Sequence, residues 1–117
     1  MDLREDDKVI LVIDDHEATL LLFSRVISLK GLAVETFSGA NPAIAWMEVN
    51  NRPDLIFCDI HMPDGNATVL INWLKEKDFS IPLVLISADH FADFHSHPFL
   101  LKPLMQEDIY NILEQHL

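Results

Sequence analysis

The sequence lacks most features of secreted, membrane and nucleic-acid-binding proteins. It has one cysteine, Cys58, so no disulfide can form within the chain. Eight Lys and Arg stand against 19 Asp and Glu, and the resulting formal net charge of -11 repels nucleic-acid phosphates and anionic lipids. No apolar run approaches the roughly 18 residues that indicate a membrane span. Residues 1–7 lack the basic and apolar regions of a signal peptide, so we expect a cytoplasmic protein with no nucleic-acid or membrane contacts of its own.

The length and the apolar content favour one domain. Half of the 117 residues are hydrophobic, which is enough for a core that buries about two-thirds of the surface of the unfolded chain. We therefore expect a single domain over residues 1–117. The acidic surplus favours basic partner surfaces and divalent cations, but it is equally typical of proteins that only need to stay in solution.

Five apolar segments predict β-strands. Val9–Ile13 is a continuous apolar run that stops at Asp14, as expected for a strand that is buried on both faces of a parallel sheet. Leu32–Phe37 is a weaker candidate, and its polar residues indicate a strand at a sheet edge. The other three segments are Leu55–Cys58, Ile81–Ile86 and Pro98–Leu101.

Helical patterns alternate with these strands. The first helix is predicted from Ala18, Leu22, Val26 and Leu29 on one face, with Gly31 as its C-terminal stop. The second is predicted to start at Asn41 as N-cap, with Pro42 in its first turn. The third is predicted from Leu70, Trp73, Leu74 and Lys77, and the last from Ile109, Ile112 and Leu113. Strands that alternate with helices predict an α/β fold, a doubly wound five-stranded parallel sheet with helices on both faces.

Polar residues follow four of the predicted strands directly. They are Asp14, Asp15, Asp59, Ser87 and Lys102. In doubly wound sheets ligands bind beyond the carboxyl ends of the strands, so we expect these side chains to converge. Three crowded carboxylates repel one another, and Mg²⁺ is the usual cation that relieves this repulsion where phosphate is also bound. Taken one at a time, the same residues are also typical of helix caps, turns and solvated loops.

These motifs resemble the receiver domains of two-component response regulators. The resemblance rests on Asp14 and Asp15 after an apolar strand, on residues 55–63 around Asp59, on residues 85–88, and on residues 99–103 with Lys102. It covers nearly the whole chain. It implies a flavodoxin-like sheet with strand order 2-1-3-4-5.

The resemblance also implies how the acidic residues act. Asp59 would accept a phosphoryl group from a histidine kinase or a phosphotransfer protein of a bacterial two-component system. Asp14, Asp15, Asp59 and the backbone carbonyl of His61 would hold Mg²⁺. The chain would then be a signalling phosphoprotein that assists its own phosphorylation and dephosphorylation, and not an enzyme with a separate substrate.

The remaining motif residues would transmit the signal. By the resemblance, Ser87 and Lys102 contact the phosphoryl oxygens, and Ser87 and Phe99 act as the conformational switch. Phe99 is equally well explained as an ordinary core aromatic of the last strand. The partners implied are an output domain or a partner protein, and a homodimer is left open.

Four features depart from the family pattern or invite another role. Asp89–His97 gives only nine residues for a crossover that usually needs at least about 10–12, so the fourth helix is expected to be stunted or absent. Ala67 stands where receivers usually have glycine. A histidine cluster, made of His90, His95 and His97, lacks the spacing of a closed zinc site. Cys58 is better explained as a small apolar filler than as a redox group.

Two other functions compete with a phosphoacceptor. A pseudo-receiver would keep the fold and bind partners without phosphorylation; the shortened crossover favours it and the complete set of acceptor residues disfavours it. A metal-dependent phosphohydrolase of the aspartyl-phosphate kind usually has a second Asp two residues after the nucleophile, and His61 stands there instead.

Overall fold

The computed structural model describes residues 8–60, 62, 66–88 and 97–117. In chain order the elements of these residues are β1 (Val9–Ile13), α1 (Glu17–Leu29), β2 (Ala33–Phe37), α2 (Ala40–Val49), β3 (Leu55–Asp59), α3 (Ala67–Glu76), β4 (Leu83–Ser87), β5 (Phe99–Leu101) and α4 (Gln106–His116). None of the helices within these ranges is long and apolar enough to cross a membrane.

The strands form one parallel sheet with the order β2-β1-β3-β4-β5. This order confirms the predicted doubly wound fold. Because β2 lies at one edge of the sheet, the edge position expected for Leu32–Phe37 is also confirmed. The order reverses between β1 and β3, which are neighbours in the sheet and place their carboxyl ends side by side.

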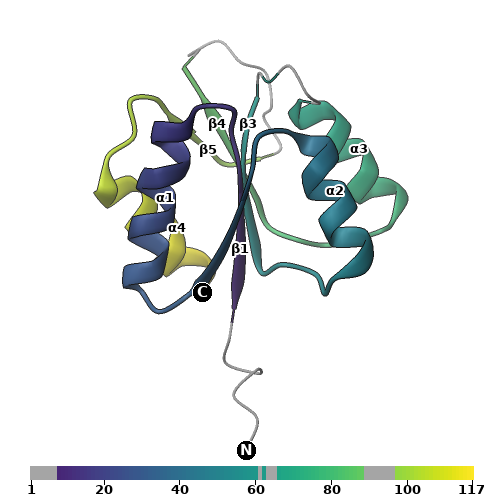
Figure 1. Cartoon of the computed structure of the whole chain (residues 1–117), viewed down its shortest axis with the longest axis horizontal. Helices are drawn as coiled ribbons and strands as arrows, with labels where there is room; N and C mark the ends of the chain where they lie inside the picture. Colours follow the sequence, from purple (N-terminus) through teal and green to yellow (C-terminus); the bar gives the residue numbers. More distant parts are fainter. Residues whose placement is uncertain (1–7, 61, 63–65, 89–96) are drawn as a thin grey trace, which may run out of the picture.

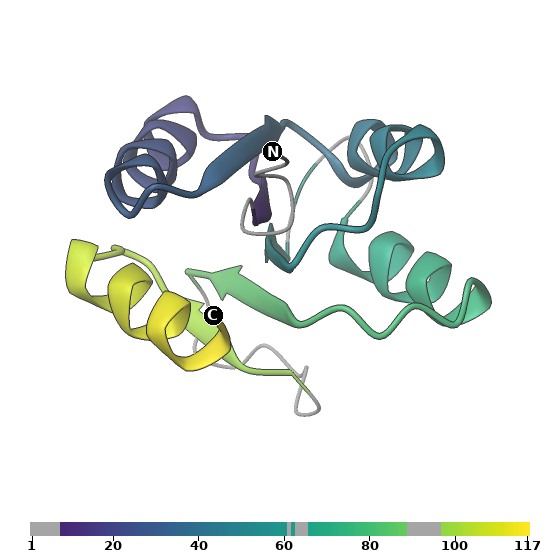
Figure 2. The same ribbon diagram turned by 90° about the horizontal axis from the view of Figure 1, so that it is seen from below.

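Two hydrophobic layers cover the sheet, one on each face. Figure 1 shows the sheet nearly edge-on, with α1 and α4 on one side and α2 and α3 on the other, and Figure 2 shows the same two layers from below. Side chains alternate between the faces along each strand. In β3, Phe57 packs toward α1 and α4, whereas Ile56 and Cys58 pack toward α2 and α3. Strands buried on both faces explain why the predicted runs contain so few polar residues.

The predicted stripe of the last helix is confirmed. Its three apolar residues, Ile109, Ile112 and Leu113, are all buried in the layer shared with α1. In α3, Leu70 and Leu74 are likewise buried.

The ends of α1 and α2 test the predicted stop and start signals. At the end of α1, the N–H of Gly31 bonds the carbonyl of Ser28 at 2.9 Å, and the N–H of Leu32 bonds that of Ile27 at 3.3 Å. These two bonds form a Schellman motif, so the predicted stop is confirmed. The predicted N-cap Asn41 is wrong, because α2 begins at Ala40 after an extended Gly39.

The start of α2 also shows why its proline is tolerated. Pro42 is the third residue of the helix, where a backbone N–H would have no partner within the helix. At the start of α3, Asn66 accepts hydrogen bonds from the backbone N–H groups of Thr68 and Val69, at 3.1 and 3.4 Å. Ala67 follows it and is fully buried, so a side chain fits at the position of the family's glycine.

Replacing Gly31 by Ala is expected to lower the free energy of unfolding by about 1–2 kcal/mol. Gly31 has φ +79°, a left-handed conformation, and a Cβ atom there would meet nothing within 4 Å, so the cost is conformational and not steric. Denaturant unfolding measures it. Gly31→Asn is the matched variant and should lose less, because asparagine tolerates this conformation better. Equal stability of the parent and Gly31→Ala would contradict the assignment.

The expected shortening of the fourth helix falls on residues that lie outside the described ranges, since these resume only at His97. His97 and Pro98, which lead into β5, belong to neither a helix nor a strand.

Candidate functional site

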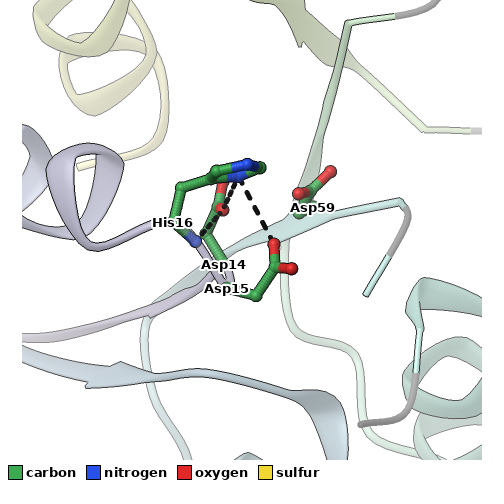
Figure 3. Close-up of side chains that lie close together, drawn as sticks. All are labelled: Asp14, Asp15, His16 and Asp59. Atoms are coloured by element: carbon green, nitrogen blue, oxygen red, sulfur yellow. Dashed lines mark hydrogen bonds and ion pairs between the residues drawn. The ribbon is translucent and has the colours of Figure 1, made fainter. Parts of the chain in front are cut away.

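Acidic side chains meet at the carboxyl ends of β1 and β3. Asp14 directly follows β1, and Asp59 is the last residue of β3. Because the two strands are neighbours, with Ile13 opposite Cys58, the two acids lie next to each other. Figure 3 shows both of them with Asp15 and His16, and their ligand atoms all lie within 4.8 Å of one another. We call these four residues the acid cluster. The convergence predicted for Asp14, Asp15 and Asp59 is thus present.

Asp14 is the most deeply buried member of the acid cluster. Its exposed fraction is 0%, against 5% for Asp59, while Asp15 is exposed. Asp14 Oδ1 accepts a hydrogen bond of 2.8 Å from the backbone N–H of His16. Asp14 Oδ2 is also buried. A buried carboxylate oxygen is costly unless a positive charge lies beside it.

Lys102 brings positive charge to the two buried acids. Its Nζ lies 3.1 Å from Asp14 Oδ2, as an ion pair, and 3.4 Å from Asp59 Oδ2. Burial lowers the pKa of Lys102, but the interaction with Asp14 and the negative charge of Asp59 outweigh it, and the net result is a raised pKa. Lys102 therefore stays protonated and offsets part of the repulsion between the carboxylates.

Ser87 lies at the same edge of the sheet. It is the last residue of β4 and is fully buried. Its carbonyl accepts a 2.8 Å hydrogen bond from the backbone N–H of Lys102, which fixes the end of β5 against the end of β4. The strand ends thus position both residues beside Asp59, as the sequence predicted.

The two other predicted site residues have different outcomes. His61, whose carbonyl was expected to bind the metal, lies outside the described residues. Phe99 begins β5 and keeps 39% of its surface exposed. The interpretation of Phe99 as an ordinary core aromatic is therefore wrong, because β5 is a short edge strand; its role as a switch stays a prediction.

His16 is the residue of this site that sequence reasoning missed. Its Nδ1 lies 3.2 Å from Asp14 Oδ1 and 3.4 Å from Asp15 Oδ1. The signal was its position directly after the acid pair, where the chain leaves β1.

Cys58 and His97 do not join the site. The Cys58 thiol is buried and donates to the Asp59 carbonyl oxygen at 3.3 Å. Burial, then the charges of Asp59 and Asp14, raise the pKa of this thiol and disfavour the reactive thiolate, in agreement with an apolar filler. His97 lines a cavity at the amino-terminal edge of β4 together with Phe79. His90 and His95 lie outside the described residues.

Comparison with known proteins gives a uniform result. A family model described as the response regulator receiver domain matches residues 10–114. The polar-differentiation response regulator DivK of Brucella anthropi is 30% identical over 84 residues, covering 69% of this chain and 67% of DivK. The two-component response regulator ORR21 of Oryza sativa subsp. indica is 29% identical over 111 residues, covering 88% of this chain but 16% of the rice protein. The chain thus spans about a sixth of the length of that relative.

The fold comparison agrees with the sequence comparison. The crystal structure of the Vibrio cholerae chemotaxis protein CheY4 matches with a TM-score of 0.84 at 20% identity, covering 95% of this chain and 99% of CheY4. At this identity the match shows the fold alone.

Proposed function

Because the chain belongs to the response regulator receiver domain family, we propose that it is a phosphoacceptor module of a two-component system. Asp59 receives the phosphoryl group, and the donor is a histidine kinase or a phosphotransfer protein. One observation supports this assignment above the others: Asp59 is a buried carboxylate at a strand end, with two further acids of the acid cluster beside it and the Lys102 ammonium 3.4 Å away.

The acid cluster fits a divalent cation. Asp14, Asp15 and Asp59 supply the carboxylate oxygens that Mg²⁺ prefers, and the buried Asp14 Oδ2 already lies 3.1 Å from the positive charge of Lys102. When bound, Mg²⁺ supplies positive charge that offsets the charge developing on the transferred phosphoryl group.

The side chains of this chain perform the transfer in one displacement. A carboxylate oxygen of Asp59 attacks phosphorus, the bond from phosphorus to the donor's histidine nitrogen breaks, and that nitrogen keeps the electron pair. The product is an acyl phosphate on Asp59. Lys102, already protonated, pairs with the new phosphoryl oxygens, and the Ser87 hydroxyl donates to another. The chain is thus an acceptor that is itself modified and returned to its first state by hydrolysis.

Incubation with acetyl phosphate and Mg²⁺ is expected to add one phosphoryl mass to the intact protein, and none to Asp59→Asn. Asp54→Asn is the matched control. Asp54 precedes the opposite end of β3, and its Oδ2 accepts the Val9 N–H at 2.8 Å, a bond that an asparagine oxygen can keep. Intact-protein mass spectrometry measures the label.

Two results would contradict the proposal. Label that persists in Asp59→Asn would mean that another group is the acceptor. A parent protein that takes no label while still binding Mg²⁺ would instead support the pseudo-receiver function, in which the fold binds partners without phosphorylation.

A further inference from the structure

The His16 ring points toward Asp14 and Asp15 although it is exposed to solvent. Its side chain is 66% exposed. The ring nevertheless places Nδ1 within 3.2 Å of Asp14 Oδ1 and 3.4 Å of Asp15 Oδ1, as the dashed lines in Figure 3 show. An exposed side chain gives up rotamer freedom to hold such a position, so the two carboxylates orient the ring.

The helix does not need this ring. His16 is the N-cap residue of α1, a position where Ser, Thr, Asn and Asp are preferred because their side chains bond the first N–H groups. The His16 side chain makes no such cap bond. Its nitrogen is therefore directed at the acids and not at the helix.

The distances within the cluster suit a coordinated ion. Ligands about 2.0–2.2 Å from a metal are about 2.8–3.6 Å from one another when they are neighbours in octahedral or tetrahedral geometry. The separations from His16 Nδ1 to the two Asp oxygens, 3.2 and 3.4 Å, fall in this range. Asp14 Oδ2 is fully buried and belongs to the same cluster.

The positively charged Lys102 side chain already lies among these atoms. Lys102 Nζ lies 3.1 Å from Asp14 Oδ2, 3.4 Å from Asp59 Oδ2 and 3.3 Å from His16 Nδ1. Two carboxylate oxygens and one ring nitrogen, from three residues, thus surround one positive charge. A metal ion bound to Nδ1 requires the flexible Lys102 side chain to withdraw from the ring.

We propose that His16 Nδ1 is a nitrogen ligand of this metal site and gives it a preference for a zinc-like first-row ion that carboxylates alone would not give. Imidazole suits Zn²⁺ and Co²⁺, whereas Mg²⁺ prefers oxygen. The proposal rests on the proposed function in that both use the acid cluster.

Titration of the intact chain with Co²⁺ and with Mg²⁺ tests the proposal. In His16→Ser the Co²⁺ affinity should fall at least about tenfold, since even indirect partners of metal ligands contribute about 10–100-fold. Mg²⁺ affinity should change by less than about threefold, because no oxygen ligand is removed. Serine is a favoured N-cap, so α1 is preserved. His116→Ser, in the last turn of α4, is the control and should leave both affinities unchanged.

A direct readout complements the affinities. The Co²⁺ form of the parent should show a strongly shifted imidazole N–H proton in its NMR spectrum, and His16→Ser should lack it. A shifted signal that survives in His16→Ser, its absence from the parent, or equal loss of Co²⁺ and Mg²⁺ affinity would overturn the proposal. Failure of the proposed function is distinguished in the parent protein, where Mg²⁺-supported labelling with acetyl phosphate is measured separately from the Co²⁺ titration.

Discussion

Mg²⁺ at a hundredfold excess over its dissociation constant is expected to raise the free energy of unfolding by about 2.7 kcal/mol. The folded chain holds the ligand atoms of the acid cluster within 4.8 Å of one another, whereas the unfolded chain disperses them and binds the ion poorly. The ion also relieves repulsion between two buried carboxylates, of which Asp14 is fully buried. Urea unfolding with and without Mg²⁺, at equal ionic strength, measures the gain.

Variants separate this effect from general screening of an acidic protein. Asp14→Asn and Asp59→Asn each remove a ligand charge and should lose most of the gain. Glu48→Gln removes one negative charge from the exposed surface of α2, away from the cluster, and this variant should keep the stabilisation by Mg²⁺. If Mg²⁺ stabilised all of these proteins equally, or stabilised none, a specific site would be excluded.

Phe57→Ala is expected to lower the free energy of unfolding by about 3–5 kcal/mol. Phe57 lies in β3, the middle strand of the sheet, and is fully buried. Its ring centroid is 4.7 Å from that of Phe23, which projects from α1. Truncation removes this contact and leaves a cavity between the sheet and the helix layer that the rigid strands cannot close.

Phe99→Ala is the matched control for this prediction. Phe99 lies on the edge strand β5 and is 39% exposed, so its removal should cost clearly less. Guanidinium unfolding of the two variants gives the comparison. A Phe99→Ala protein that is less stable than Phe57→Ala would contradict the account of the core.

The sequence predicted many parts of the fold that depend on local pattern. The predicted face of α1 was wrong in part, because Leu29 is 68% exposed and Phe23 and Ile27 are buried instead. Val9–Ile13 matches β1 at both ends, because an apolar run between charged residues has only one way to be buried. Gly31 was predicted correctly because its left-handed backbone is nearly specific to glycine. Asn41 was predicted incorrectly, because an extended Gly39 starts α2 two residues earlier and the asparagine falls inside the first turn.

The residues of the site that lie at strand ends could be predicted from the sequence. Asp14 and Asp59 follow buried strands, so any parallel sheet that makes these strands neighbours brings the two acids together. His16 was not predictable in the same way, because the direction of its exposed ring toward Asp14 and Asp15 depends on the folded backbone, although both acids are its neighbours in sequence. The exposure of Phe99 likewise depends on the shortness and edge position of β5, which the apolar pattern does not reveal.

Reductive trapping of the phosphorylated protein tests the central claim most directly. After incubation with acetyl phosphate and Mg²⁺, borohydride converts an aspartyl phosphate to homoserine, and peptide sequencing by mass spectrometry locates it. The account predicts homoserine at position 59 alone, and none when Mg²⁺ is removed by a chelator. Homoserine at Asp14, Asp15 or Asp54, or none at position 59 in a protein that carries the phosphoryl mass, would contradict it.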